Sequence, residues 1–552
     1  MARVNPRQLK LTRLLRPRSD SAGGASSDNG RNLWRNWLMP FGMIAGFSVA
    51  AYFWFHFLDL QISGDAIPYS DVIFLSNAED VGNALGGVSE VLIAILGLVV
   101  TVVAIVVQLA SQRYTPKLVD LFVADRINIG YFMLMVVASM YSLLLVYSTK
   151  SIFLPFWGSL FLLAMTTVIL GMLLPYFNYV FLFLTPGNII RIIRKNAKRG
   201  MDKVPLAKTP PTAYPGLQNE VANAMEQISD IALSAVSQMD RNLALLSIRT
   251  LKDVMVDHLL LKRKMPKSWF RPQKDHFPAV STDFLQETYQ SNTWVEMKGF
   301  LDLELIFKMA INEMPDAVSA VANNTRIIGL YAIKLRDVQV LQSVVEFFNT
   351  FLRLSLNNRN PKALYNLFYQ YRLLGEAVME QDHDLAERIV FYFKYYGQIA
   401  QNYNVPLILI TAAFDLSYLL RKAYEKDVAN IEALIKIFLE VDDNPATQSN
   451  EFDLRSVRKA QLNFASYLLS QGDEKLVKFI YEDIIVEPKE RLDAIREEMM
   501  AVKDRKFWEV TDRGVDFFYL DDDQKHYLNI FFERYIDPHY QLPSHSMQKV
   551  TA

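Results

Sequence analysis

The stretch from Gly86 to Asn128 reads GGVSEVLIAILGLVVTVVAIVVQLASQRYTPKLVDLFVADRIN and decides the fold of this chain. Residues 91–110 carry no charged side chain. At about 1.5 Å of rise per residue, a helix of this length crosses the ~30 Å hydrocarbon core of a bilayer. The stretch therefore predicts a membrane-spanning helix over residues 88–110, and with it an integral membrane protein.

A second pattern lies inside this helix. Small and polar residues recur at alternating steps of four and three, which places them on one helix face. We call this face the α-stripe; its members are Glu90, Ala94, Gly97, Thr101, Ala104, Gln108 and Ser111. The other positions from Val91 to Leu109 are Val, Ile or Leu. Because Gln108 is costly against lipid, we expect the stripe to face protein or water.

Three further apolar segments predict a transmembrane domain of four helices over residues 34–190. They cover residues 38–58, 129–147 and 156–184. Gly42, Gly46 and Ala50 form a ridge of small residues in the first, a pattern typical of close helix contact in lipid. The loop over residues 59–87 is acidic and lacks Lys and Arg, whereas the loop over residues 111–128 and the exit at residues 191–199 are basic. The positive-inside rule then predicts a multi-pass inner-membrane protein with both termini in the cytoplasm.

The remainder predicts a large cytoplasmic all-helical domain over residues 217–536, after a linker at residues 191–216. Helix starts fall at an Asp or Pro suited to a first turn. These starts are Asp316, Asp337, Pro361, Asp384, Pro406, Asp427, Asp453 and Asp473. Alternate starts recur every 45–47 residues, which indicates stacked α-hairpins of a solenoid-like array. The segment 264–292 is expected to be a polar connection.

Three shorter segments complete the domain prediction. Residues 1–33 are basic and predict a disordered cytoplasmic tail, and residues 537–552 predict a second disordered tail. Thr115 and Pro116 suit the start of a short helix with apolar residues on one side. That helix either lies in the cytoplasmic membrane interface or packs on the soluble domain.

Composition argues against several classes of protein. The net charge of −1 gives no basic surplus for nucleic acid, and the absence of cysteine removes disulfides, thiolate metal sites and cysteine nucleophiles. The seven histidines are not at metal-ligand spacing. Asp521–Asp523 before His526 favours a solvated helix N-terminus over a cation site. No phosphate loop or nucleophile motif is present, so we expect no enzyme, no catalytic residue, no metal and no cofactor.

Two blocks resemble a family of bacterial integral membrane proteins known as predicted membrane proteins with a domain of unknown function. The first, Thr101–Asn128, contains Thr101, Gln108, Ser111, Tyr114, Pro116, Leu118, Phe122 and Asp125–Arg126. The second is Ile228–Ala244, reading ISDIALSAVSQMDRNLA. In the family the second block usually continues into a Pro-x-Ile-Asn-Asp-Pro-like turn, where this chain has Gln238–Asn242. The resemblance covers about residues 35–260 and implies no biochemical activity.

Three functions compete for the stripe. It is a helix-packing seam in which Gln108 makes an interhelical hydrogen bond. Alternatively it lines the pore of a homo-oligomeric, channel-like protein with a regulatory cytoplasmic domain, where Glu90 forms an acidic ring that favours cations. In the third hypothesis the membrane helices only anchor a helical-repeat scaffold or signalling protein that binds a cytoplasmic protein partner. Expected partners are thus the lipid bilayer, further copies of the chain, ions and a cytoplasmic protein.

Overall fold

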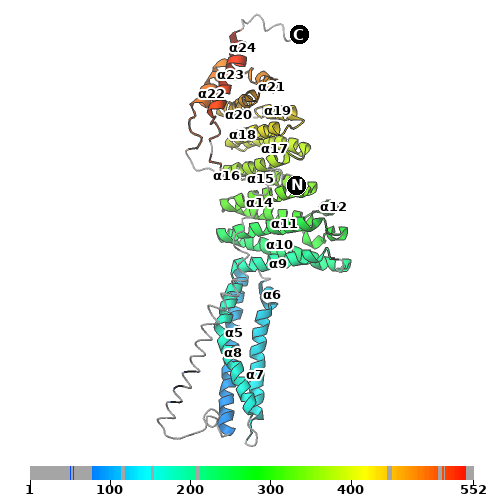
Figure 1. Ribbon diagram of the computed structural model, residues 1–552, viewed down its shortest axis with the longest axis vertical. Coiled ribbons are helices and arrows are strands. Elements are labelled where there is room, and N and C mark those ends of the chain that lie inside the picture. The colour runs from blue at the N-terminus through cyan, green and yellow to red at the C-terminus, as the bar shows by residue number, and fades with distance from the viewer. Residues whose placement is uncertain are drawn as a thin grey trace, which may run out of the picture. The chain divides into compact units, whose positions relative to one another are not determined.

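The computed structural model describes residues 78–113, 118–150, 155–206, 210–443, 451–507, 513–514 and 516–541, together with Ala50, Trp54 and Phe57. Within these ranges the elements are helices and no strand forms (Figure 1). The chain divides into two compact units, residues 1–189 and 190–552. The all-helical prediction, with apolar helices followed by a large helical domain, is confirmed.

The first unit, which we call the membrane unit, contains the apolar helices. Their bounds are α5 (Ala78–Arg113), α6 (Leu118–Val123), α7 (Arg126–Ser148) and α8 (Phe156–Phe183). Among the described residues, three helices are long and apolar enough to cross a membrane, over Glu79–Gln112, Arg126–Ser148 and Trp157–Phe183. The segment predicted as a first span, residues 38–58, lies outside the described residues apart from three isolated positions, as does the basic tail at residues 1–33.

Helix α5 begins ten residues before its predicted start at residue 88. The acidic loop predicted for residues 59–87 therefore ends in helix, because Glu79 and Asp80 lie in the first turn of α5, where they complement the positive end of the helix dipole. The 36 residues of α5 correspond to a length of about 54 Å, more than the ~30 Å hydrocarbon core requires. Glu90 consequently lies well inside a helix rather than at its beginning.

The α6–α7 corner is built by the residues that carry the first block of the family resemblance. Asp125 caps α7 by accepting from the backbone N–H of Ile127 (3.0 Å) and from the hydroxyl of Tyr179 on α8 (2.8 Å). The amide of Asn128 donates to the carbonyl of Phe122 at 2.9 Å. Phe122 is buried and packs edge-to-face on Phe183. The short helix α6 thus packs on a helix of its own unit, and its place in the membrane interface stays a prediction.

The second unit, the helical array, begins inside α9 (Pro186–Lys203). The prediction of a linker at residues 191–216 is therefore wrong for residues 191–203. Helix α9 is strongly amphipathic, with Ile193, Ala197 and Met201 buried. Arg194 on its polar side binds Asp253 (2.8 Å) and Asp257 (3.1 Å) on the next hairpin. The linker prediction took these basic residues only as a cytoplasmic exit signal and overlooked their helical spacing.

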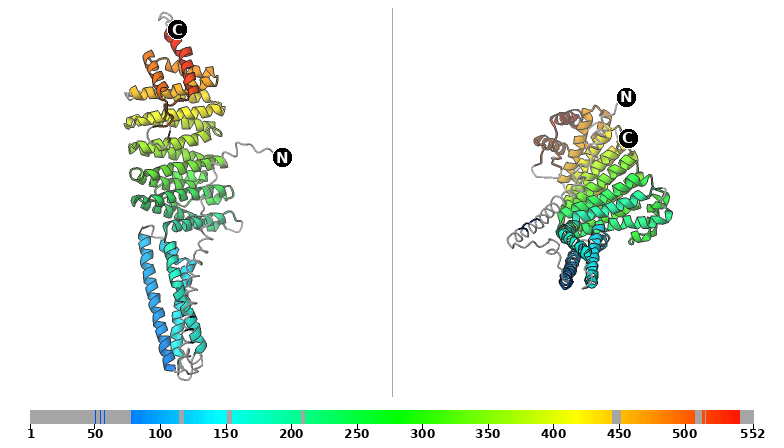
Figure 2. Two further views of the ribbon diagram at one scale, coloured as in Figure 1. Left: turned by 60° about the vertical axis from the view of Figure 1, so that its left-hand side comes forward. Right: turned by 60° about the horizontal axis from the view of Figure 1, so that its bottom comes forward.

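Stacked hairpins form the rest of the array (Figures 1 and 2). The helices are α10 (Tyr214–Ser237), α11 (Arg241–Lys262), α12 (Thr282–Gln290), α13 (Trp294–Ala310), α14 (Pro315–Leu335), α15 (Val338–Asn357), α16 (Pro361–Val378), α17 (His383–Asn402), α18 (Leu407–Glu425), α19 (Ile431–Leu439), α20 (Glu451–Ser470), α21 (Glu474–Ile484), α22 (Lys489–Ala501), α23 (Asp522–Phe531) and α24 (Asp537–Gln541). A π-helical turn, Phe532–Ile536, joins the last two. The C-terminal tail predicted to be disordered from residue 537 thus starts as helix; residues 542–552 lie outside the described residues.

Two layers run through the array. Layer A consists of α11, α14, α16, α18, α20 and α23, each packed on the next, and layer B consists of α13, α15, α17, α19 and α21. Layer-A helices of successive hairpins begin at Pro315, Pro361, Leu407 and Glu451, within two residues of the predicted starts. Because each hairpin buries one face on its neighbours, the apolar core runs continuously from one end of the array to the other.

Four of the turns between the described helices share one construction. The last residue before a new helix cap adopts a left-handed backbone, as Arg336 (φ 54°) and Arg359 (φ 48°) do, and the next residue is Asp or Asn. At Asp337 the backbone N–H closes α14 on the carbonyl of Ala332 (2.9 Å), while the carboxylate accepts from the N–H of Val340 (3.2 Å) and starts α15. The same arrangement recurs at Asp240, Asn360 and Asp473.

Replacing Arg336 by Gly tests this construction. A left-handed conformation costs a non-glycine residue about 1–2 kcal/mol. Glycine removes this cost, but its greater conformational freedom in the unfolded chain offsets part of the gain in stability. Arg336→Gly is therefore expected to stabilise the array by about 0.5–1 kcal/mol, since the Arg336 side chain is exposed. Gly472→Ala, at φ 79° in the equivalent turn, should destabilise it by about 1 kcal/mol. Thermal unfolding monitored by circular dichroism measures both changes, and equal effects of the two variants would contradict the prediction.

Candidate functional site

The α-stripe lies on the surface of the membrane unit. Glu90, Ala94, Gly97, Thr101, Ala104 and Gln108 are all exposed, and Ser111 is half-buried. The buried residues of α5 lie on another face, which packs on α7 and α8 and is mostly aliphatic: Leu85, Ser89, Leu92, Val99, Val103 and Val107. The structure thus keeps the seven predicted residues together on one face and leaves that face outside the contacts between the described helices.

The middle of the stripe is open. A Cβ atom added at Gly97 would meet no other atom within 4 Å, so this glycine is not needed for contact with α7 or α8. The hydroxyl of Thr101 donates to the carbonyl of Gly97 at 2.8 Å, which satisfies that hydroxyl within its own helix. Gln108 and Glu90 remain the two stripe residues whose polar groups are hardest to place against lipid.

The polar contacts inside the membrane unit use other residues. The hydroxyl of Ser142 on α7 donates to that of Ser89 on α5 at 3.1 Å, and the hydroxyl of Tyr131 donates to the carbonyl of Ile169 on α8 at 3.3 Å. The rings of Tyr131 and Tyr176 stack with their centroids 4.1 Å apart. Within the described part of this unit, the polar contacts between helices thus come from residues outside the stripe.

A buried histidine in the array makes contacts that the sequence analysis, which considered the seven histidines only as metal ligands, did not identify. His258 and Glu296 are fully buried, with 2.6 Å between Nδ1 and Oε1. The indole of Trp269 donates to Nε2 of His258 at 3.1 Å, so the ring proton is on Nδ1 and is donated to Glu296. Burial raises the pKa of Glu296, but His258, with contributions from Lys262 and a backbone hydrogen bond, outweighs burial and the pKa is lowered.

This triad is structural, because none of its three side chains reaches solvent. It also pins residues 264–292, where a polar connection was expected. Trp269 is completely buried, and its carbonyl accepts from Gln218 (2.7 Å) and from the indole of Trp294 (3.1 Å). Only the two tryptophans could have signalled this packing in the sequence.

A second buried polar cluster involves a residue far along the chain. Asp415 on α18 has no exposed surface and binds Nη1 (2.5 Å) and Nη2 (2.9 Å) of Arg513, which lies between α22 and α23. Arg372 on α16 approaches the same carboxylate at 3.1 Å. The guanidinium of Arg513 also lies over the ring of Tyr365, 4.3 Å from its centroid. The arginine therefore anchors its segment on α16 and α18.

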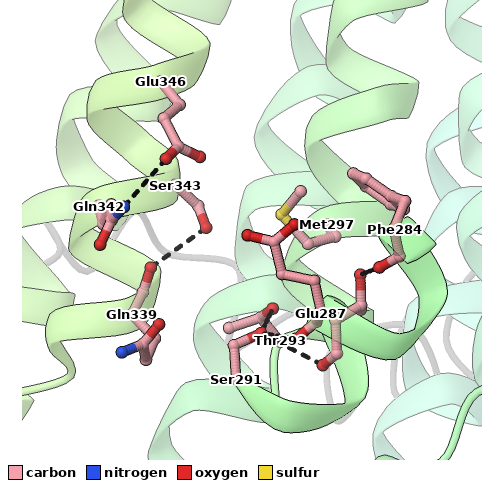
Figure 3. A pocket seen from close by; sticks show the side chains of 10 residues that line it. Phe284, Glu287, Ser291, Thr293, Met297, Gln339, Gln342, Ser343 and Glu346 are labelled. Carbon is pink, nitrogen blue, oxygen red and sulfur yellow. Dashed lines mark hydrogen bonds between the residues drawn. The ribbon is translucent and has the colours of Figure 1, made fainter.

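Small recesses on the array and on the membrane unit differ in what they offer a ligand. Figure 3 shows one of about 80 Å³ between α12, α13 and α15, with Glu287 and Glu346 at its edge. Its polar groups bond locally, as in the Gln342–Glu346 pair at 3.2 Å, and it is too small for most ligands. Another, of about 410 Å³ along α6 and α7, is almost entirely apolar. Among the described residues, no group of three or more acidic or histidine side chains could hold a metal.

Comparison with known proteins agrees with the membrane assignment. Residues 35–220 match a family model described as "Predicted membrane protein (DUF2254)". The resemblance stated from the sequence is thus confirmed, although the match ends at residue 220 rather than 260 and leaves the Ile228–Ala244 block outside it. No curated protein and no solved structure matches the chain. The family description states membrane residence and gives no activity.

Asp302 provides a pH test of the array. Its pKa is raised from 3.8 to about 7: burial is the main cause, Lys298 opposes it, and the acidic Glu226 and Asp230 add to the rise. The folded state therefore binds a proton that the unfolded state has released, so this residue makes stability fall as pH rises from about 4 to about 7.

Asp302→Asn should remove that slope and unfold at a higher denaturant concentration than the wild type at pH 8, with a smaller difference at pH 4. Each unit of pKa corresponds to about 1.4 kcal/mol, so the gain should be easily measurable. Glu313→Gln, which neutralises an exposed acid just beyond the end of the same helix, is the control. A wild-type advantage at pH 8 would contradict the assignment.

Proposed function

We propose that this membrane protein is a homo-oligomer in which the α-stripes of several copies border a hydrated ion path, with the helical array as its cytoplasmic regulatory part. One observation supports the proposal above the others: the stripe is exposed, whereas the face of α5 that packs on α7 is almost entirely aliphatic. In water this arrangement would be the ordinary one, but on a membrane-spanning helix it leaves polar groups on a surface that lipid would otherwise cover. In a membrane, placing a charged residue at the bilayer centre costs about 2.5–3.5 kcal/mol, so Glu90 and Gln108 favour protein or water beside them.

A pore accounts for the residue types along the stripe. Ala94, Gly97 and Ala104 leave space, while Thr101 and Gln108 present oxygen atoms that can replace water around a cation. Glu90 adds negative charge toward the acidic end of α5, where Glu79 and Asp80 also lie. Since carboxylates in a low-dielectric opening concentrate cations, the proposed path is cation-selective.

The proposed topology is multi-pass in the inner membrane, with both termini and the array in the cytoplasm. It rests on the excess of Lys and Arg in residues 111–128 and 191–199 over the acidic segment at residues 59–87. A reporter fused after residue 552 should be active on the cytoplasmic side, and one inserted near Asp71 on the outer side. The reverse pattern would overturn the topology.

Cysteine cross-linking tests the oligomer, because the natural chain contains no cysteine to interfere. Gly97→Cys and Ala104→Cys should form disulfide-linked dimers in membranes, since a disulfide needs Cα atoms within about 7 Å. Leu98→Cys is the control: it lies at the same depth, is exposed, and points about 100° away around the helix. Cross-linking of Gly97→Cys to Gly46→Cys within one chain, and not between chains, would assign the stripe to the first span and contradict the oligomer.

Ion flux into liposomes tests the path itself. Glu90→Gln should reduce cation conductance or selectivity without changing the size-exclusion profile, because it removes charge but little volume. Gly97→Leu and Ala104→Leu should block flux by filling the path. If the leucine variants instead disrupt assembly, by about 1–3 kcal/mol for overpacked contacts, the stripe is a packing seam. Absence of flux from the wild type under voltage, tension and osmotic challenge would overturn the channel proposal.

The second candidate is a membrane-anchored scaffold that binds a cytoplasmic protein. Its support is the size of the array, since stacked hairpins present an extended surface well suited to partner binding. In that case the stripe variants should bind the cytoplasmic partner with the same affinity as the wild-type protein. We propose no enzymatic role, because neither buried polar cluster of the array is open to a substrate.

A further inference from the structure

A polar recess lies on layer A of the array, and none of its lining residues takes part in the proposed ion path. It measures about 490 Å³ and lies between α11, α14 and α16. Helix α11 contributes three basic side chains, Arg241, Arg249 and Lys252, whereas the only acidic side chain among the lining residues is Asp316 on α14. Amide side chains of α14 and α16, including Asn323 and Gln370, complete the lining.

The basic residues are only partly neutralised. Arg241 pairs with Asp316, and Lys252 pairs with Asp253, a carboxylate that already binds Arg194 at 2.8 Å. Arg249 is exposed and has no hydrogen bond or ion pair within the described residues. The recess therefore carries a surplus of positive charge on side chains that can move toward a ligand.

A fourth cation stands beside the recess. Arg326 on α14 is half-buried, and its guanidinium donates from Nε to Oε1 of Gln370 (2.8 Å) and from Nη2 to Oδ1 of Asn323 (2.9 Å). No carboxylate pairs with it within the described residues, and burial lowers its pKa. A partly buried cation held only by neutral amides is under-compensated, so a nearby anion would stabilise it.

The side-chain amides of Asn323 and Gln370 are oriented by Arg326 so that their NH₂ groups can act as hydrogen-bond donors. Because their oxygen atoms accept from Arg326, the NH₂ groups of Asn323 and Gln370 are left to donate elsewhere. The recess thus combines two amide donors with the guanidinium of Arg249 and the charged ends of Arg241 and Lys252. A donor-rich, positively charged cavity is complementary to an oxyanion.

We propose that this recess binds the phosphate group of a small phosphorylated ligand. A phosphate monoester carries about −1.5 to −2 charges and three strong acceptor oxygens at neutral pH, which matches the charge surplus and the number of donors better than one carboxylate does. The volume lies in the range of small-molecule sites. The phosphate belongs either to a soluble metabolite or to a lipid headgroup. This inference does not depend on the ion path.

Calorimetric titration of the full-length protein in detergent and a phosphate-free buffer tests the proposal. Glycerol 3-phosphate is the soluble probe and dihexanoyl phosphatidic acid the headgroup probe; whichever binds more tightly identifies the source. Saturable binding of at least one is expected, with an accompanying rise in melting temperature. Loss of one charge-assisted hydrogen bond in Arg249→Gln should weaken binding about tenfold or more.

Arg336→Gln is the matched control, since it removes the same charge from an exposed arginine at the far end of α14. Asn323→Ala supplies a second variant that leaves the charge of the recess unchanged, and it too should weaken binding. Three results would overturn the proposal: no saturable binding of either probe at millimolar concentration, equal weakening by Arg249→Gln and Arg336→Gln, or citrate binding as tightly as the phosphate probes.

Discussion

Single residues that close one helix and open the next control the geometry of the array. At Asp337 the backbone N–H satisfies a carbonyl at the end of α14, while the carboxylate satisfies an N–H at the start of α15. The left-handed residue before it is what allows both bonds to form within so short a turn. Since helices can pack antiparallel only if they reverse quickly, the stacking of layers A and B depends on this turn. Asp240, Asn360 and Asp473 repeat it without a common surrounding sequence.

The membrane unit obeys a different constraint. Its helices satisfy their own backbone groups, so side chains alone decide which faces meet. Ser89, Ser142 and Tyr131 supply the polar contacts between helices, and aliphatic residues fill the space around them. The α-stripe is left on the surface. Polar residues are unfavourable on a surface that faces lipid, and the functional proposal for this unit rests on that cost. The contacts among the described helices do not show what covers the stripe.

Local features of the fold were predictable from the sequence. Uncharged apolar runs marked α5, α7 and α8, and an Asp or Pro marked the starts of the array helices to within a few residues, because spans and caps depend on neighbours in sequence. Contacts between distant residues were not predictable. The burial of Trp269 beneath His258, the docking of α9 through Arg194, and the recess beside Arg326 each combine residues from separate helices. Seven stripe residues could be grouped on one face, but their exposure depends on which other face of α5 packs against α7.

Arg513 alters how such an array should lose its structure. In a stack where each hairpin touches only its neighbours, the ends fray independently and opening proceeds one hairpin at a time. The bonds from Arg513 to Asp415 and to the carbonyl of Tyr365 connect residues separated by 98 and 148 positions. They tie the C-terminal hairpins to the middle of the stack, so the intervening helices open together or not at all. Amide hydrogens of α18 and α20 would then exchange as one cooperative block. Force applied at the C-terminus would be borne mainly by the contacts of Arg513 with α16 and α18.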